Sequence, residues 1–491
     1  MNYKLIARLL SMIMLILTLA FGVCLAVSIW MDSGPSALIA REAFMASIAT
    51  SLASALLLFW VGRNASFKFF RKEALAVIGL SWILASVIGA IPYIILTPHI
   101  GSSGAIFESA SGITTTGASV LSDLESLPKS LLFWRALSQW IGGMGVVVFF
   151  VAILGFLGAD AKILYANEAS GSVADFEESR VQKTVLQLIY LYLGLSALCT
   201  LAYWIVGMGW FDATCHMFTT VSTAGFSTRT ESMAAFDNPL IEWVCILFML
   251  IAGVSFFLQL RIINGNAAYL KRNTEFYIYF GLFLIASAVV SINLILEGEF
   301  ESWPHAIRAA TFNVTSILTT TGYATEDFAA WSILPQSILI CLMVIGGCSG
   351  STSGGIKVFR TALALKMAAI AIERSFRTRI IRPIRINDRI VHDSTAHETM
   401  TFLVMNGMLF FAGVIILSSF EPALQVESSL SAVTSCMFNI GPGFFKVGPT
   451  ETYAFFQPWS KLLLSLLMIM GRLELYAVLV LFSPTLWKRF R

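Results

Sequence analysis

The sequence predicts an all-α polytopic membrane protein. Four repeats, each a transmembrane helix, a pore half-helix and a second transmembrane helix, surround a central pore and follow two extra N-terminal transmembrane helices. Of the 491 residues, 57% are apolar and only 12% are charged, and the mean hydropathy is +0.79. A soluble domain of this composition lacks the polar surface it needs. In addition, a polar, glycine-centred turn recurs four times, each time after an apolar stretch too short to cross a bilayer.

Ten apolar segments are long enough to span a membrane, since about twenty helical residues cross about 30 Å of hydrocarbon. These segments lie near residues 5–30, 38–61, 73–97, 132–158, 183–206, 240–262, 275–297, 335–372, 398–419 and 459–482. Most Lys and Arg residues fall in the loops on the same side as the N-terminus, which is typical of cytoplasmic loops. We therefore expect a multipass protein of the cell inner membrane with both termini in the cytoplasm.

Four shorter apolar stretches, at 104–115, 212–223, 304–318 and 427–438, lie between the outer ends of successive helices. Each is followed at once by a turn centred on Gly117, Gly225, Gly322 or Gly441, and these glycines are 108, 97 and 119 residues apart. Non-helical backbone at membrane depth is tolerated only where it is buried in protein or lines a watery cavity. A lone T-x-G is an ordinary loop, but four copies at near-equal spacing favour an ion pore.

The repeat also predicts the division of the chain. We expect an accessory hairpin at 1–70 and pore repeats at 71–160, 161–265, 266–390 and 391–491.

The turns have the composition of a cation filter. A filter must aim consecutive carbonyl oxygens at one axis, which requires backbone angles, positive φ included, that glycine adopts without a Cβ penalty. Neighbouring hydroxyl groups can add oxygen ligands, although the fourth turn offers Asn and Ile instead. The predicted filter residues are Thr115, Thr116, Gly117, Ser222, Thr223, Ala224, Gly225, Thr320, Thr321, Gly322, Asn439, Ile440 and Gly441.

A second cluster of glycines interrupts the predicted helix at 335–372. Residues 346–355 contain five glycines and four hydroxyl residues, a composition that breaks regular helix. The segment lacks the order of a phosphate-binding loop, because Lys357 is followed by Val358. We interpret it as an intramembrane gate formed by Gly346, Gly347, Gly350, Ser351, Gly354 and Gly355.

Arg472 is a basic residue deep within the last predicted helix, where a charge is costly enough to suggest a function. We expect it to face the pore as part of the gate. A structural pairing with Glu474 is the alternative, although residues two apart on a helix do not face each other. Glu108 and Asp212 are candidates for attracting cations to the outer mouth, and Asp212 is equally suited to capping its half-helix.

The four turns resemble the filter segments of the Trk/Ktr/HKT superfamily of cation transporters. The matching segments are SGITTTGAS at 111–119, FTTVSTAGFS at 218–227, TSILTTTGYAT at 315–325 and CMFNIGPGF at 436–444. The resemblance extends from about residue 70 to the C-terminus, and the two extra N-terminal helices are similar to those of the TrkH/TrkG branch.

This resemblance implies a potassium-selective pore in one subunit, assembled as a homodimer and gated by a cytoplasmic nucleotide-binding regulator of the TrkA type. Within the family, glycine at position 117 implies K+ as the transported ion, because members with serine there tend to pass Na+. The family also has a flexible loop and an arginine at places matching 346–355 and Arg472.

Several alternatives remain open at this stage. The same fold is compatible with a Na+-conducting relative or with a symport of K+ with Na+ or H+. The scattered histidines and the absence of a nucleophile turn argue against an enzyme, and we expect no organic cofactor and no nucleic acid. The basic segment 373–385 is suited either to docking a regulator or to contacting anionic membrane lipid, and the loop at 159–182 is a second candidate contact surface.

Overall fold

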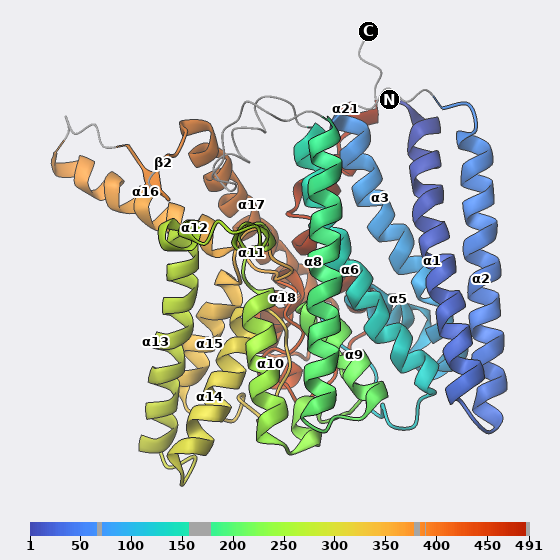
Figure 1. Cartoon of the computed structure of the whole chain (residues 1–491), viewed down its shortest axis with the longest axis horizontal. Helices are drawn as coiled ribbons and strands as arrows, with labels where there is room; N and C mark the ends of the chain where they lie inside the picture. The colour runs from blue at the N-terminus through green and yellow to red at the C-terminus, as the bar shows by residue number, and fades with distance from the viewer. Residues whose placement is uncertain (66–70, 157–177, 378–382, 388, 488–491) are drawn as a thin grey trace.

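The computed structural model describes residues 1–65, 71–156, 178–377, 383–387 and 389–487 (Figure 1). The described part is almost entirely helical, which confirms the predicted all-α polytopic fold. A short antiparallel pair, β1 (Arg385–Ile386) and β2 (Arg389–Ile390), is an exception. Residues 157–177, which hold most of the second candidate contact surface, lie outside the described part, as do residues 378–382 of the basic segment.

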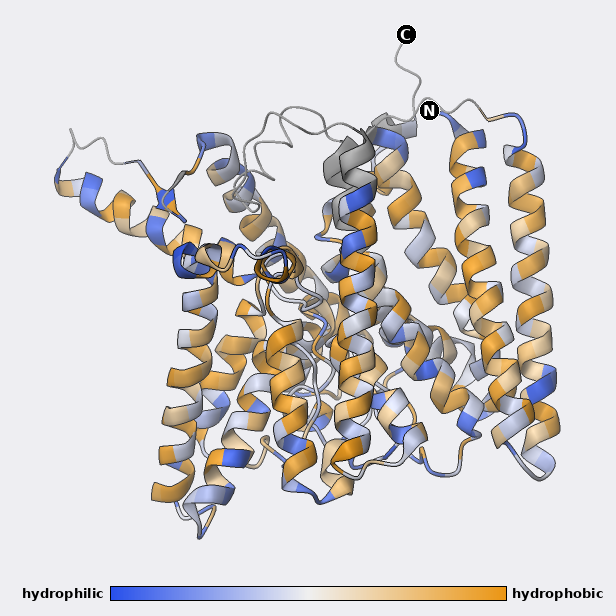
Figure 2. Cartoon of the chain, viewed as in Figure 1, coloured by the Kyte–Doolittle hydropathy of each residue, from blue (hydrophilic) through white to orange (hydrophobic). Residues whose placement is uncertain are grey.

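Six helical spans of the described residues are long and apolar enough to cross a membrane, and eight are if each of two bent helix pairs counts as one span. The six are α1 (Tyr3–Met31), α2 (Pro35–Gly62), the span Lys72–Leu96, α8 (Glu178–Ile205), α13 (Thr274–Leu296) and α17 (Asp393–Phe420). Apolar residues dominate the middle of these helices and hydrophilic residues gather at their ends (Figure 2). The chain is therefore a membrane protein with multiple transmembrane helices.

Helices α1 and α2 form the accessory hairpin beside the first repeat (Figure 1). The Asn2 side chain caps α1 by accepting a hydrogen bond from the Leu5 amide at 3.1 Å. Pro35 begins α2 at a position where its missing N–H costs no helical hydrogen bond. At the turn between them, Asp32 accepts a hydrogen bond from the Ser130 hydroxyl at 2.5 Å, which joins the hairpin to the first repeat.

Four helical units follow the hairpin, and each contains a half-helix between two longer segments. Repeat 1 comprises α3 (Arg71–Gly89), α4 (Ile91–Leu96), the half-helix α5 (Gly101–Ile113) and α6 (Lys129–Phe156). Repeat 2 comprises α8, the half-helix α9 (Trp210–Val221), α10 (Pro239–Ala252) and α11 (Phe256–Ile263).

The other two repeats have the same order of elements. Repeat 3 comprises α13, the half-helix α14 (Trp303–Leu318), α15 (Ile333–Ile345) and α16 (Val358–Phe376). Repeat 4 comprises α17, the half-helix α18 (Val426–Met437), α19 (Pro458–Arg472) and α20 (Tyr476–Leu479).

The prediction of a continuous helix is wrong for two segments. The segment predicted at 240–262 bends by 95° between α10 and α11, and the segment at 459–482 bends by 117° between α19 and α20. At the second bend, Glu474 and Leu475 have φ of 54° and 66°, outside the helical range. Hydropathy averaged over about twenty residues does not reveal these bends, because apolar residues dominate the sequence on both sides of each one. The break between α15 and α16, in contrast, falls where the glycine cluster predicts it.

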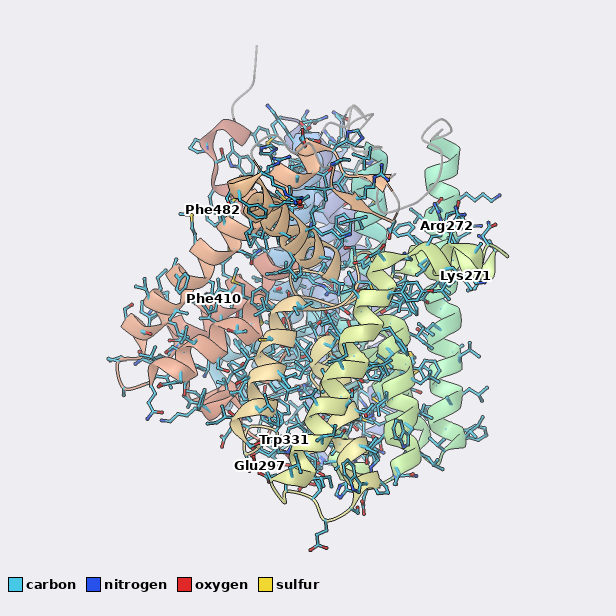
Figure 3. The ribbon with its side chains drawn as sticks, turned by 90° about the vertical axis from the view of Figure 1, so that its left-hand side faces the viewer. Lys271, Arg272, Glu297, Trp331, Phe410 and Phe482 are labelled. Atoms are coloured by element: carbon cyan, nitrogen blue, oxygen red, sulfur yellow. The ribbon has the colours of Figure 1, made fainter. Side chains whose placement is uncertain are left out.

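Charged side chains lie toward both ends of the molecule (Figure 3). Lys271 and Arg272, in α12 (Ala268–Arg272), lie at the end opposite Glu297 and Trp331 (Figure 3). The N-terminus is at the same end as α12, α16 and α21 (Pro484–Trp487) (Figure 1). A hydrogen bond joins the N-terminal segment to α21, since the Tyr3 hydroxyl donates to the Trp487 carbonyl at 3.1 Å.

Candidate functional site

All four half-helices end in the same left-handed closure. The residue two positions before the glycine of each turn has positive φ, 56° at Thr115, 51° at Thr223, 56° at Thr320 and 56° at Asn439. The amide that follows donates back to the carbonyl five positions earlier, a Schellman ending of the helix. These bonds are Thr116 to Ser111 at 2.9 Å, Ala224 to Thr219 at 2.9 Å, Thr321 to Ser316 at 2.8 Å and Ile440 to Ser435 at 3.0 Å.

Three of these closures place threonine where glycine or asparagine is usual. A β-branched residue with positive φ is an outlier, and such backbone strain persists only where the surrounding structure imposes it. The repeated geometry therefore indicates that packing around the turns dictates the backbone at Thr115, Thr223 and Thr320.

The four glycine turns form a closed ring. Each glycine faces the carbonyl oxygen of the residue that precedes the glycine of the next turn, and all four glycines have positive φ. A Cβ built on Gly117 would lie 2.3 Å from Ala224 O, on Gly225 2.0 Å from Thr321 O, on Gly322 2.0 Å from Ile440 O, and on Gly441 2.7 Å from Thr116 O. The contacts run from turn 1 through turn 4 and back to turn 1, so the turns encircle a common axis.

The predicted filter side chains are buried around this ring. Asn439 Nδ2 donates to the Thr116 hydroxyl at 2.8 Å and so joins the fourth turn to the first. The Thr319 and Thr321 hydroxyls are 2.8 Å apart within the third turn. Ser222 differs, because its hydroxyl donates back to the Phe218 carbonyl of its own half-helix at 2.7 Å.

Helix α6 supports the first two turns through residues that the sequence analysis missed. Buried Arg135 donates through Nε to Glu108 Oε1 at 2.9 Å and through a terminal nitrogen to the Ser227 carbonyl at 3.0 Å. Four residues later, Gln139 donates to the Ala224 carbonyl at 2.8 Å and accepts from the Phe226 amide at 3.1 Å. The signal in the sequence was a basic residue inside a predicted transmembrane helix.

These contacts change the interpretation of the acidic residues near the outer mouth. Glu108 is fully buried and paired with Arg135, so it is not a free charge at the mouth. Asp212 lies in the first turn of α9, accepts from the Thr228 hydroxyl at 2.7 Å and forms an ion pair with Arg229 at 3.1 Å. Both carboxylates therefore hold the loops that follow the turns.

Another carboxylate joins the loops that follow the first and second glycine turns. Glu125 accepts hydrogen bonds from the amide and the hydroxyl of Thr230. Partial burial opposes the ionisation of Glu125, but these bonds and nearby Arg229 outweigh it and lower the pKa of the carboxyl.

The first and last residues of the intramembrane loop between α15 and α16 lie next to each other. A Cβ on Gly355 would lie 2.7 Å from Gly346 Cα, so the two ends of the glycine cluster touch. Gly346, Gly350 and Gly355 have φ between 72° and 75°, which suits glycine. The structure thus brings the predicted gate residues together in one folded segment.

This loop contacts the ends of three half-helices. Thr352 donates through its hydroxyl to the Val221 carbonyl at 3.1 Å. The Gly354 amide donates to the Thr320 hydroxyl at 2.6 Å, and the Gly355 amide donates to the Phe438 carbonyl at 3.0 Å. The loop therefore joins the turns of repeats 2, 3 and 4.

The unpredicted bend between α10 and α11 accommodates the same loop. The Cys348 amide donates to the Gly253 carbonyl and the Phe256 amide donates to the Gly350 carbonyl, both at 3.0 Å. The loop thus satisfies backbone groups that the interrupted helix leaves free.

Arg472 lies at the end of α19 and is only 6% exposed. One terminal nitrogen donates to the Thr352 carbonyl at 2.7 Å, whereas its Nε and other terminal nitrogen have no hydrogen-bond partner among the described residues. Glu474 instead pairs with Arg360 of α16 at 2.6 Å, so the alternative pairing of Arg472 with Glu474 is wrong. The structure brings Arg472 and the intramembrane loop together.

Comparison with known proteins agrees with this architecture. Residues 39–489 match the family model TrkH, described as a cation transport protein. The chain is 32% identical over 452 residues to the Trk system potassium uptake protein TrkH of Salmonella typhimurium, covering 91% of this chain and 93% of that protein. It is 31% identical over 498 residues to TrkH of Halomonas elongata, with full coverage of both chains.

A solved structure is also similar over nearly the whole chain. The crystal structure of the potassium transporter TrkH from Vibrio parahaemolyticus matches with a TM-score of 0.89 and 28% identity, covering 99% of this chain and 100% of that one. Together with the match to the family model, this similarity shows that the chain belongs to the TrkH family of cation transport proteins.

Proposed function

We propose that this chain is the pore-forming subunit of a potassium uptake system and conducts K+ through the ring of glycine turns. The main support for this proposal is the ring of contacts between successive turns, because a closed ring requires all four turns to share one axis. The relatives support the choice of ion, since they are named as potassium uptake proteins.

The proposed chemistry is the exchange of water for protein oxygens around the ion. Carbonyl and hydroxyl oxygens of the turns replace the hydration shell of K+. The C-terminal ends of the four half-helices carry partial negative charge and meet at the turns, which favours a cation there. Transport of this kind requires neither covalent chemistry nor an organic cofactor.

The proposed gate consists of the loop at 346–355 and Arg472. The loop bonds to the ends of three half-helices, so its displacement would alter the path next to the filter. Arg472 binds that loop at Thr352 and places a buried positive charge beside it. Such a charge opposes the passage of cations.

We further propose a homodimer in the cell inner membrane with both termini in the cytoplasm. Lys271 and Arg272 lie at the same end of the molecule as the N-terminus, and basic residues are typical of cytoplasmic ends (Figures 1 and 3). A TrkA-like nucleotide-binding subunit would bind at this end, where anionic lipid headgroups also meet the basic side chains. The proposed units remain the hairpin at 1–70 and the repeats at 71–160, 161–265, 266–390 and 391–491.

The test is K+ and Na+ flux into liposomes that contain the purified chain, measured beside the variant Gly117→Ser. A Cβ at this position meets the Ala224 carbonyl, so the first and second turns must shift. We expect the preference for K+ over Na+ to fall about tenfold or more, equivalent to about 1.4 kcal/mol. Gly281→Ser is the matched control, because a Cβ there meets nothing within 4 Å, and it should keep the preference.

Other outcomes separate the alternatives. Na+ flux without K+ flux would replace the proposal with the Na+-conducting relative. K+ uptake that requires an inward H+ or Na+ gradient would indicate a symport. A closed chain that opens only on addition of a TrkA-like regulator with nucleotide would support the proposed partner.

A further inference from the structure

Glu275 is a buried carboxylate that the filter does not use. It lies in the first turn of α13 and is 8% exposed. Its Oε1 accepts a hydrogen bond from the Ser349 amide at 2.6 Å and another from the Phe359 amide at 3.2 Å. Ser349 lies within the intramembrane loop, and Phe359 is the second residue of α16, which follows the loop. One oxygen atom of Glu275 therefore joins the loop to the helix that follows it.

The chemistry of these bonds makes them stronger than the neighbouring contacts of the loop. A carboxylate forms charge-assisted hydrogen bonds, which are about twice as strong as neutral ones. The Phe359 amide belongs to the first turn of α16, where amides lack helical partners and the helix dipole favours a negative charge. Removing the carboxylate would leave both amides buried without this acceptor.

The start of α13 is also tied to the short β hairpin. The Thr274 amide donates to the Asn387 side chain at 2.7 Å, and the Asn387 amide donates back to the Thr274 hydroxyl at 3.3 Å. Lys366 of α16 donates to the Arg385 carbonyl of the same hairpin at 2.7 Å. The hairpin lies near α12, at the basic end of the molecule (Figure 1).

We propose that Glu275 is a positioning residue that latches the intramembrane loop, and that the pairing of Asn387 with Thr274 couples this latch to the basic end of the molecule. Residues 274 and 275 are adjacent, so a shift of the hairpin that moves Thr274 also moves the acceptor of Ser349 and Phe359. The proposal that Glu275 latches the loop is argued from the hydrogen bonds of the loop. The effect of the latch on transport depends in addition on the proposed function of the loop as a gate.

The test uses Cys348, which precedes Ser349 in the loop and is 2% exposed. The intact chain in detergent is treated with a small, uncharged maleimide, and the rate of labelling at each cysteine is measured by peptide mass spectrometry. In Glu275→Ala, we expect Cys348 to label about tenfold faster, equivalent to about 1.4 kcal/mol of lost protection. Exposed Cys341 reports reagent delivery, and buried Cys436 reports global unfolding.

Conservative substitution separates latching from general packing. Glu275→Gln keeps an oxygen acceptor without the charge, so its Cys348 should label at an intermediate rate. If Glu275→Ala does not fold, the labelling rate of Cys348 in Glu275→Gln still tests the latch. Unchanged labelling of Cys348 in both folded variants would overturn the latch, and so would a parallel rise at Cys436.

The coupling to the hairpin has its own test. Asn387→Ala should accelerate labelling of Cys348, and the double variant with Glu275→Ala should label no faster than Glu275→Ala alone, because both act on one element. Additive effects would refute the coupling. If Glu275→Ala exposes Cys348 but leaves K+ flux unchanged, the latch stands and the gate assignment of the loop fails.

Discussion

At the scale of single residues, Arg472 combines a buried charge with a hydrogen bond to the Thr352 carbonyl. We predict that Arg472→Ala raises K+ flux into liposomes about tenfold, since it removes both the charge and a contact that holds the loop. That change corresponds to about 1.4 kcal/mol in the barrier. Arg472→Lys keeps the charge and should stay near the flux of the unaltered chain, and a lower flux in the alanine variant would contradict the barrier role.

At the scale of elements, the intramembrane loop is held against the half-helices by glycine backbone. A Cβ on Gly354 would lie 2.2 Å from the Phe438 carbonyl, so Gly354→Ala must push the loop away from α18. We predict higher unregulated K+ flux and a stability loss of about 1–3 kcal/mol, typical of overpacking, measured by flux and by thermal unfolding in detergent. Gly407→Ala in α17 meets nothing within 4 Å and should change neither quantity appreciably; equal effects of the two variants would argue against the loop contact.

At the scale of the whole molecule, the basic end and the opposite end should face different compartments. We predict that a cysteine at Glu299 reacts with a membrane-impermeant maleimide on intact cells, whereas a cysteine at Lys271 reacts only after permeabilisation. Both positions are exposed, and α12, which contains Lys271, lies at the same end of the molecule as the N-terminus (Figure 1). The unaltered chain gives the background labelling of the native cysteines. Labelling of the cysteine at Lys271 on intact cells, with the cysteine at Glu299 protected, would place the termini outside the cell.

Much of the fold follows from local sequence. The half-helix predicted at 104–115 is α5 at Gly101–Ile113, and the helix predicted at 275–297 is α13 at Thr274–Leu296. Apolar length decides these elements, because the bilayer fixes the length of a span. The bend at Gly253 was missed, since the partner that stabilises it, Cys348, is 95 residues away in the chain.

The sequence by itself determined the four glycine turns, the glycine cluster at 346–355 and the unusual charge at Arg472, because each depends on residue type and spacing. Only the tertiary structure decided their neighbours. It placed the Gly117 turn against Ala224, and it bonded Arg472 to Thr352 and Glu474 to Arg360. It also placed Glu275 against both Ser349 in the loop and Phe359 at the start of α16. These contacts join residues that are far apart in the chain, so they arise from packing between repeats and from the need to satisfy buried polar groups, which no local pattern encodes.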